Sequence, residues 1–171
     1  MVAALKGVAP YDWASYLKAH VDTLNPPLQD GLAATGWKLV YTDKESDFEA
    51  QYNSRSQPSR HLYNFAWSIG LTMNDKGQVN DVRWNGPAFK AGVTTGATLV
   101  AVNGQDYSKD VLKDAIAAAK TSKAPIQLLM KYQGAIRNVA VDYHDGLQYP
   151  HLVRIDGKPD YRQAAQWFRK A

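Results

Sequence analysis

The pattern of apolar and polar positions predicts a helix and then a strand near the start of the chain. Six residues recur at spacings of three and four, which places them on one helical face: Trp13, Tyr16, Leu17, His20, Val21 and Leu24. Asp12 precedes them as a candidate N-cap, and Asn25-Pro26-Pro27 is expected to end the helix. After Gly36, alternation in residues 37–42 predicts a short strand.

Residues 61–143 show the clearest periodic organisation. A strand-like run through Met73 precedes a glycine-containing turn at residues 74–77, and residues 78–84 read as the returning strand. A short helix is then expected to begin at Pro87, because proline suits the first helical position.

The second half of this region predicts two hairpins on either side of a long helix. Asn103-Gly104 is the strongest short hairpin signal and lies inside the strand pair expected in residues 98–107. Ser108 is expected to cap a helix that runs to about Lys120. Two apolar runs within residues 126–143 then form the last hairpin.

The long helix carries two apolar stripes at helical spacing. One contains Leu112, Ile116 and Ala119, and the other contains Val111, Ala115 and Ala118. Two stripes need two surfaces to cover, so one is expected on the sheet core and the other on a partner or a groove. Val111 and Ala115 are the candidates for lining the helix side of such a groove.

Gly70 interrupts the otherwise apolar run of residues 65–73, and an interior glycine costs a strand stability. A bend here would aim the amides of Ile69, Gly70 and Leu71 into one concavity that attracts a carboxylate. An extended peptide would then add as a strand beside Leu71. The plainer interpretation is a β-bulge, with Ile69 and Leu71 filling the core.

Four segments in this order resemble a PDZ domain of the bacterial, protease-associated type. They are SIGL at 68–71, GPAFKAGV at 86–93, TLVAVNGQDY at 98–107 and DVLKDAIAAA at 110–119. The resemblance implies that Ser68, Ile69, Gly70 and Leu71 form the carboxylate-binding loop of that family. The fold expected is α+β, a PDZ-like partly open β-barrel of five to six strands with one short and one long helix.

The flanking segments extend the resemblance to nearly the whole chain. APYDWASYL, GWKLVYTD, YNFAWSIGLTM and VDYHDGLQYPHLVRI resemble the C-terminal part of the glycyl aminopeptidase family. These are zinc metallopeptidases of the thermolysin-like superfamily with a C-terminal PDZ domain. Their zinc motif HExxH does not occur in this sequence. The resemblance therefore implies that zinc belongs to a catalytic domain upstream of Met1, and no cofactor is expected in this chain.

The same resemblance suggests four regions. Residues 1–42 would be the end of the catalytic part, 43–60 a polar linker, 61–143 the PDZ domain and 144–171 a packing tail. The tail is expected to hold turns at Tyr149-Pro150 and Asp156-Gly157 and a short helix from Pro159.

Composition narrows the remaining possibilities. The chain has no cysteine, which excludes disulfides and a cysteine nucleophile. Its net charge of +4 comes from well-mixed charges without a nucleic-acid-binding motif, so no nucleic-acid partner is expected. No apolar run approaches the ~20 residues of a membrane span. The compartment stays open among periplasmic, secreted and cytoplasmic.

Neither a histidine metal site nor a catalytic serine is predicted. His20, His61, His144 and His151 lack the spacing of zinc ligands. Ser68 lies in WSIG and not in the G-x-S-x-G elbow of hydrolases.

These observations predict a non-catalytic PDZ module from the C-terminus of a zinc aminopeptidase, inactive by itself. Its expected partners are peptides, protein C-termini or the catalytic domain of its own parent. The alternative is a free-standing PDZ adaptor that binds protein C-termini. A reading frame that continues upstream into an HExxH helix would favour the first of these.

Overall fold

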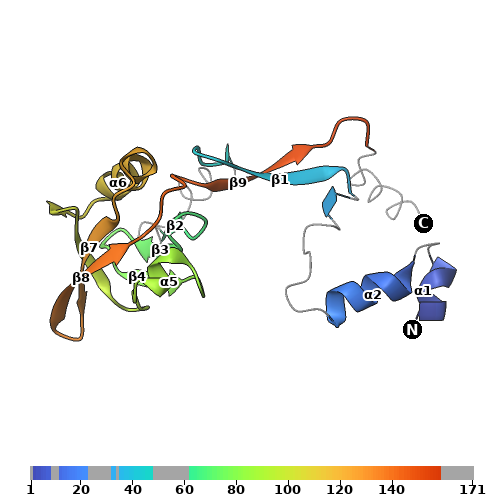
Figure 1. Ribbon diagram of the computed structural model, residues 1–171, viewed down its shortest axis with the longest axis horizontal. Coiled ribbons are helices and arrows are strands. Elements are labelled where there is room, and N and C mark those ends of the chain that lie inside the picture. The colour runs from blue at the N-terminus through green and yellow to red at the C-terminus, as the bar shows by residue number, and fades with distance from the viewer. Residues whose placement is uncertain (1, 9–11, 23–31, 34, 48–61, 159–171) are drawn as a thin grey trace. The chain divides into compact units, whose positions relative to one another are not determined.

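The structure is a computed structural model that describes residues 2–8, 12–22, 32–33, 35–47 and 62–158 (Figure 1). The chain divides into two compact units. One comprises the residues up to Val40 and from Leu152 onward, and the other comprises Tyr41–His151.

The first unit contains two helices, α1 (Val2–Val8) and α2 (Trp13–Val21). Asp12 caps α2 as predicted, because its side chain accepts a hydrogen bond from the amide of Ser15 at 3.2 Å. The expected end of this helix at residues 25–27 lies outside the described residues. Helix α1 was not predicted from the sequence.

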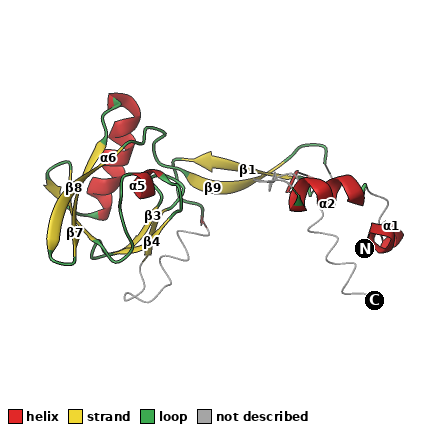
Figure 2. Cartoon of the chain, turned by 60° about the horizontal axis from the view of Figure 1, so that its bottom comes forward, coloured by secondary structure: helices red, strands yellow, loops and turns green. Residues whose placement is uncertain are grey.

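A two-stranded sheet pairs β1 (Trp37–Thr42) with β9 (Tyr149–Arg154), as Figures 1 and 2 show. The predicted turn at Tyr149-Pro150 is wrong, because both residues lie inside β9. Proline lacks an N–H and is tolerated in an edge strand, and both strands of a two-stranded sheet are edges. The helix expected from Pro159 lies outside the described residues.

The second unit contains two open sheets. The first has the order β2-β3-β4 and the second the order β6-β5-β7-β8. The bounds of the strands are Leu62–Phe65 (β2), Leu71–Asn74 (β3), Val79–Val82 (β4), Thr98–Val102 (β5), Gln105–Asp106 (β6), Ile126–Tyr132 (β7) and Ala135–Val141 (β8). The predicted α+β class is confirmed. The run expected to continue through Met73 is broken after Phe65, and this break adds β2 to the strands foreseen.

Two helices accompany these sheets, the short α5 (Pro87–Lys90) and the long α6 (Lys109–Ser122). Ser108 caps α6 as predicted, since its side chain accepts a hydrogen bond from the amide of Val111 at 3.2 Å. Pro87 opens α5, also as predicted.

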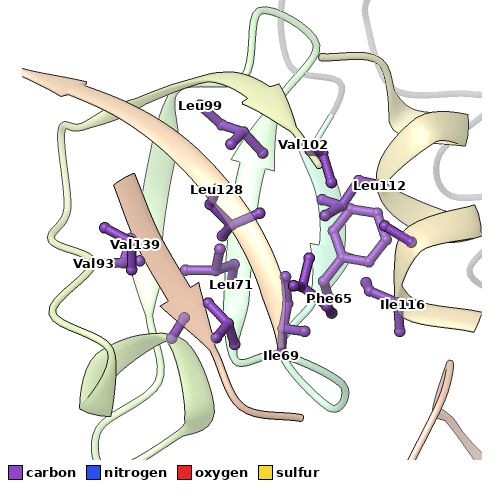
Figure 3. Close-up of a cluster of buried hydrophobic side chains, with 14 of the residues drawn as sticks. Phe65, Ile69, Leu71, Val93, Leu99, Val102, Leu112, Ile116, Leu128 and Val139 are labelled. Carbon is purple, nitrogen blue, oxygen red and sulfur yellow. The ribbon is translucent and has the colours of Figure 1, made fainter. Parts of the chain in front are cut away.

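The core of the second unit lies between α6 and the sheets (Figure 3). Its largest fully buried side chains are Phe65, Ile69, Leu71, Met73, Leu99, Leu112, Ile116, Ile126, Leu128 and Met130. The stripe of Leu112, Ile116 and Ala119 faces this core, as the sequence predicts.

Two tyrosines make the stability of this unit sensitive to alkali. Burial, then the neighbouring Tyr63 and Asp75, raises the pKa of Tyr107 from 10.0 to about 12. Burial, then Asp145, raises the pKa of Tyr143 to about 12. In the unfolded chain both phenols ionise near pH 10, so unfolding becomes favoured as the pH rises from about 10 toward 12.

We therefore expect the free energy of unfolding, measured with urea, to fall between pH 10 and pH 11.5. Tyr107→Phe should reduce that fall, because phenylalanine has no proton to lose. The exposed Tyr132, changed to Phe, serves as the control. A pH-independent free energy over this range in the unmodified protein would contradict the prediction.

Candidate functional site

The loop between β2 and β3, residues 66–70, is a tight bend held by the main chain. The carbonyl of Phe65 accepts hydrogen bonds from the amides of Ser68 at 3.1 Å and Gly70 at 3.0 Å. On the other side, the carbonyl of Gly70 accepts from the amide of Arg83 at 2.9 Å. Gly70 has a φ of 84°, which explains the glycine.

The close approach expected at Gly70 comes from the protein itself. A Cβ placed on Gly70 would lie 3.5 Å from the Cα of Gly86 and 3.6 Å from the Cδ of Pro87. These distances are ordinary contacts, so the positive φ rather than lack of space requires glycine here. The carbonyl of Ile69 adds to this packing by accepting from the amide of Ala88 at 2.9 Å.

The expected concavity of free amides is not formed in this conformation. The amide of Gly70 donates to Phe65, and Leu71 pairs with Phe65 on one side and Val82 on the other. The side chains of Ile69 and Leu71 are both fully buried. The physical reason is β2, which precedes β3, pairs with it antiparallel and brings the Phe65 carbonyl to the loop.

Ser68 is buried and ties the loop to the segment after β8. Its side-chain oxygen accepts a hydrogen bond from the amide of Gln148 at 3.0 Å. Nearby, the hydroxyl of Tyr143 donates to the carbonyl of Gly146 at 2.8 Å. The Ser68 side chain therefore anchors the protein's own main chain, and no histidine base lies among these contacts.

Two side chains of β2 reach α6. Phe65 is buried, and its ring points toward Leu112 and Ile116 (Figure 3). Tyr63 packs against the core, and the ammonium nitrogen of Lys109 lies 4.6 Å from the centre of its ring. The edge of β3 beside α6 is therefore occupied by a strand of the same chain.

The second apolar stripe of α6, formed by Val111, Ala115 and Ala118, lies partly against the core and partly at the surface. Val111 is half-buried and packs against the core, and Ala115 is buried. Ala115 and Ala118 border a shallow depression of about 350 Å³ that Asn103 and Gln127 also line. The sequence predicts the apolar character of this stripe but not this depression.

Glu45 joins the predicted linker to α6. Its carboxylate accepts a hydrogen bond from Lys113 at 3.2 Å and pairs with Lys109 at 3.4 Å. Lys113 also lies 5.9 Å from the centre of the Tyr149 ring. Sequence reasoning missed this clasp, although Lys109 and Lys113 are like charges four residues apart on one helix, a repulsive pair that favours a nearby acid.

The two lysines set the ionisation of the clasp. Burial alone would raise the pKa of Glu45, but the hydrogen bonds and charges of Lys113 and Lys109 outweigh it and hold that pKa below the ordinary value of 4.5. The clasp therefore contributes stability above pH 4.5 and loses it as the pH falls through the lowered pKa.

The described histidines bond to protein atoms. His144 contacts the carboxylate of Asp142 at 2.7 Å and the carbonyl of Ala119 at 3.1 Å. His151 contacts the carbonyl of Lys44 at 2.8 Å, and His20 contacts the carbonyl of Tyr16 at 2.8 Å. In the described part of the chain, no three His, Cys, Asp or Glu residues group as a metal site would need.

None of the helices that the structure describes is both long enough and apolar enough to cross a bilayer.

No protein-family model and no curated protein matches the chain. Among solved structures, it is similar to an aminopeptidase N family protein from Idiomarina loihiensis, with a TM-score of 0.50 and 12% identity. That likeness covers 91% of this chain but 26% of the other, so the chain spans about a quarter of that protein.

The chain is also similar to the HtrA3 PDZ domain bound to a phage-derived ligand (FGRWV). The TM-score is 0.33 at 14% identity, over 69% of this chain and 91% of that one. At these identities the likenesses concern the fold alone.

Proposed function

We propose that the chain is a non-catalytic PDZ-like module that binds an extended peptide or a protein C-terminus between β3 and α6. The observation that carries this proposal is the occupant of the β3 edge, which is only the four-residue strand β2. An edge that already pairs with a short antiparallel segment offers the same main-chain hydrogen bonds to a peptide.

The loop supplies the site for a terminal carboxylate. Once β2 leaves the edge, the Phe65 carbonyl leaves with it, and the amides of Ser68 and Gly70 lose their acceptor. A carboxylate oxygen takes that place, with Ile69 and Leu71 flanking it. Val111, half-buried against the core, belongs to the helix side of the same site, whereas Ala115 lines the depression with Asn103 and Gln127.

The parent protein we propose is a zinc aminopeptidase of the glycyl aminopeptidase type. The proposal rests on the sequence resemblance of the flanking segments. The likeness in fold to a segment of an aminopeptidase N family protein, which covers 91% of this chain, supports it. In that parent the catalytic zinc lies in the upstream domain, and the partner of this module is a peptide or that domain itself.

Peptide affinity tests the function directly. Fluorescein-labelled hexapeptides that end in a large apolar residue are titrated as free acids and as C-terminal amides, with anisotropy as the readout. The acid should bind about 10- to 100-fold more tightly, because hydrogen bonds to a charged group contribute about 1.5–3 kcal/mol.

The binding site is located in the same experiment by amide chemical shifts. Changes should concentrate in β3 and α6, and a scrambled peptide should produce none. Equal affinity of acid and amide would remove the carboxylate site from this proposal, and binding of neither peptide would refute the function.

A further inference from the structure

We propose that β2 is an internal ligand that keeps this groove closed, and that the partner which displaces it is a C-terminal segment of matching chemistry. That segment ends in an aromatic residue, has a second aromatic residue two positions earlier, and carries an acidic side chain upstream. This inference rests on the proposed function and adds to it the class of partner and the competition that controls access.

The main chain of β2 already has the orientation of such a ligand. It runs antiparallel to β3, with Phe65 opposite Leu71 and Tyr63 opposite Met73. At its C-terminal end, the Phe65 carbonyl oxygen accepts two loop amides, from Ser68 at 3.1 Å and Gly70 at 3.0 Å. This oxygen occupies the position that a terminal carboxylate oxygen would take.

The side chains of β2 define what the groove accepts. Residues two apart on a strand point to the same face, so Tyr63 and Phe65 project together toward α6. The Phe65 ring fills an enclosed apolar space beside Leu112 and Ile116. The Tyr63 ring lies under the ammonium group of Lys109 at 4.6 Å. A ligand that replaces both rings restores the buried area and the cation–π contact.

The charge of the groove defines the third feature. Lys109 and Lys113 both face Glu45, and no other carboxylate pairs with them among the described residues. An incoming acidic side chain would compete with Glu45 for these two ammonium groups. Glu45 therefore occupies Lys109 and Lys113 in the closed state, and these two ammonium groups are the docking point for the negative charge of the incoming segment.

A partner binds only those molecules in which β2 is displaced. Its observed affinity is therefore its intrinsic affinity multiplied by the fraction of such molecules. A partner with all three features recovers the contacts that β2 gives up, whereas a peptide with only an apolar end recovers one. Selectivity follows from this competition.

A disulfide that locks β2 in place tests the inference. Asn64 and Thr72 are register partners, neither is fully buried, and the chain has no other cysteine. Directly opposed strand residues lie ~4.5–5.5 Å apart at Cα, which suits a disulfide. The variant Asn64→Cys/Thr72→Cys is titrated, oxidised and reduced, with the labelled free-acid peptide Glu-Glu-Leu-Tyr-Asn-Phe.

We expect the reduced form to bind and the oxidised form to lose at least about tenfold in affinity, because β2 can no longer leave. The matched control is Lys131→Cys/Ile136→Cys, another register pair, which lies in the β7–β8 hairpin. Its oxidation should not change binding. In addition, Glu45→Gln should tighten binding of the acidic peptide several-fold, because it removes the competitor for Lys109 and Lys113. Asp114→Asn, which changes an exposed carboxylate on α6, should not.

The outcomes separate the two proposals. Equal peptide affinity of the oxidised and reduced locks would overturn the internal ligand while leaving a peptide-binding protein. If a peptide with its two aromatic residues at adjacent positions bound equally well, the proposed class of partner would be overturned. A reduced form that dimerises by exchanging β2 would make a second copy the partner and overturn the peptide ligand. Binding of no peptide to any form would refute both proposals.

Discussion

Replacing Phe65 with alanine is expected to lower the free energy of unfolding by about 3–5 kcal/mol. The side chain is 1% exposed and lies in the cluster shared by β3 and α6 (Figure 3). Removing the ring leaves a cavity in addition to the lost transfer free energy, since the residues around it belong to separate elements. Urea denaturation followed by tryptophan fluorescence measures the change.

The matched control is Tyr132→Ala, which removes a 39% exposed ring at the end of β7. Its expected loss is below about 1 kcal/mol. A peptide that ends in phenylalanine should stabilise the Phe65→Ala protein more than the unmodified one, because it refills the space. If Phe65→Ala cost no more than Tyr132→Ala, the ring would not be part of the core and β2 would not be a buried occupant of the groove.

Local signals account for most of what the sequence predicted. The cap of α6 depends on Ser108 and the amide three residues later, and the predicted bond is present. The hairpin at Asn103-Gly104 depends on two residues with positive φ, and both have it, at 50° and 82°. Such features need no knowledge of the rest of the chain.

The features that the sequence did not predict depend on distant partners. Glu45 lies 68 residues from Lys113, so nothing near it in sequence marks it as part of a clasp. In β2, the polar Asn64 lies between Tyr63 and Phe65. Only the pairing of these residues with β3 shows that they form a separate strand and not the start of one run through Met73.

The same reason explains the fate of the candidate site. SIGL is a correct signal for a bend, and Gly70 has the positive φ that the bend needs. Whether the amides of that bend stay free depends on what the preceding residues do, and Phe65 closes them from the other strand. The bend at Gly70 was predictable from the sequence, but the strand that occupies its amides was not.

A second large loss of stability is expected for Gly77→Ala. Gly77 has a φ of 76°, and a Cβ on it would lie 2.6 Å from the carbonyl oxygen of Leu99 and 2.9 Å from the ring of Tyr107. A left-handed conformation costs a non-glycine residue about 1–2 kcal/mol, and the overlap with a backbone oxygen adds to it. We expect a total of about 3 kcal/mol or more.

Gly77 lies this close to Leu99 and Tyr107 because the turn after β3 joins the two sheets of the second unit. The amide of Leu99 donates to the carbonyl of Gly77 at 2.9 Å, and Gln78 forms an isolated bridge to Thr98. A side chain at Gly77 would push β5 away from this turn, and with it the contact that holds the β2-β3-β4 sheet against the rest of the core.

Gly134→Ala isolates the part of the loss that comes from packing. Gly134 has a similar φ of 83°, but nothing lies within 4 Å of the Cβ that would be added. Its expected loss is only the conformational cost of about 1–2 kcal/mol. Urea denaturation of both variants should therefore give a difference of at least about 1 kcal/mol. Equal losses would mean that the overlap with Leu99 and Tyr107 adds nothing to the cost, and that the turn after β3 does not hold β5 in place.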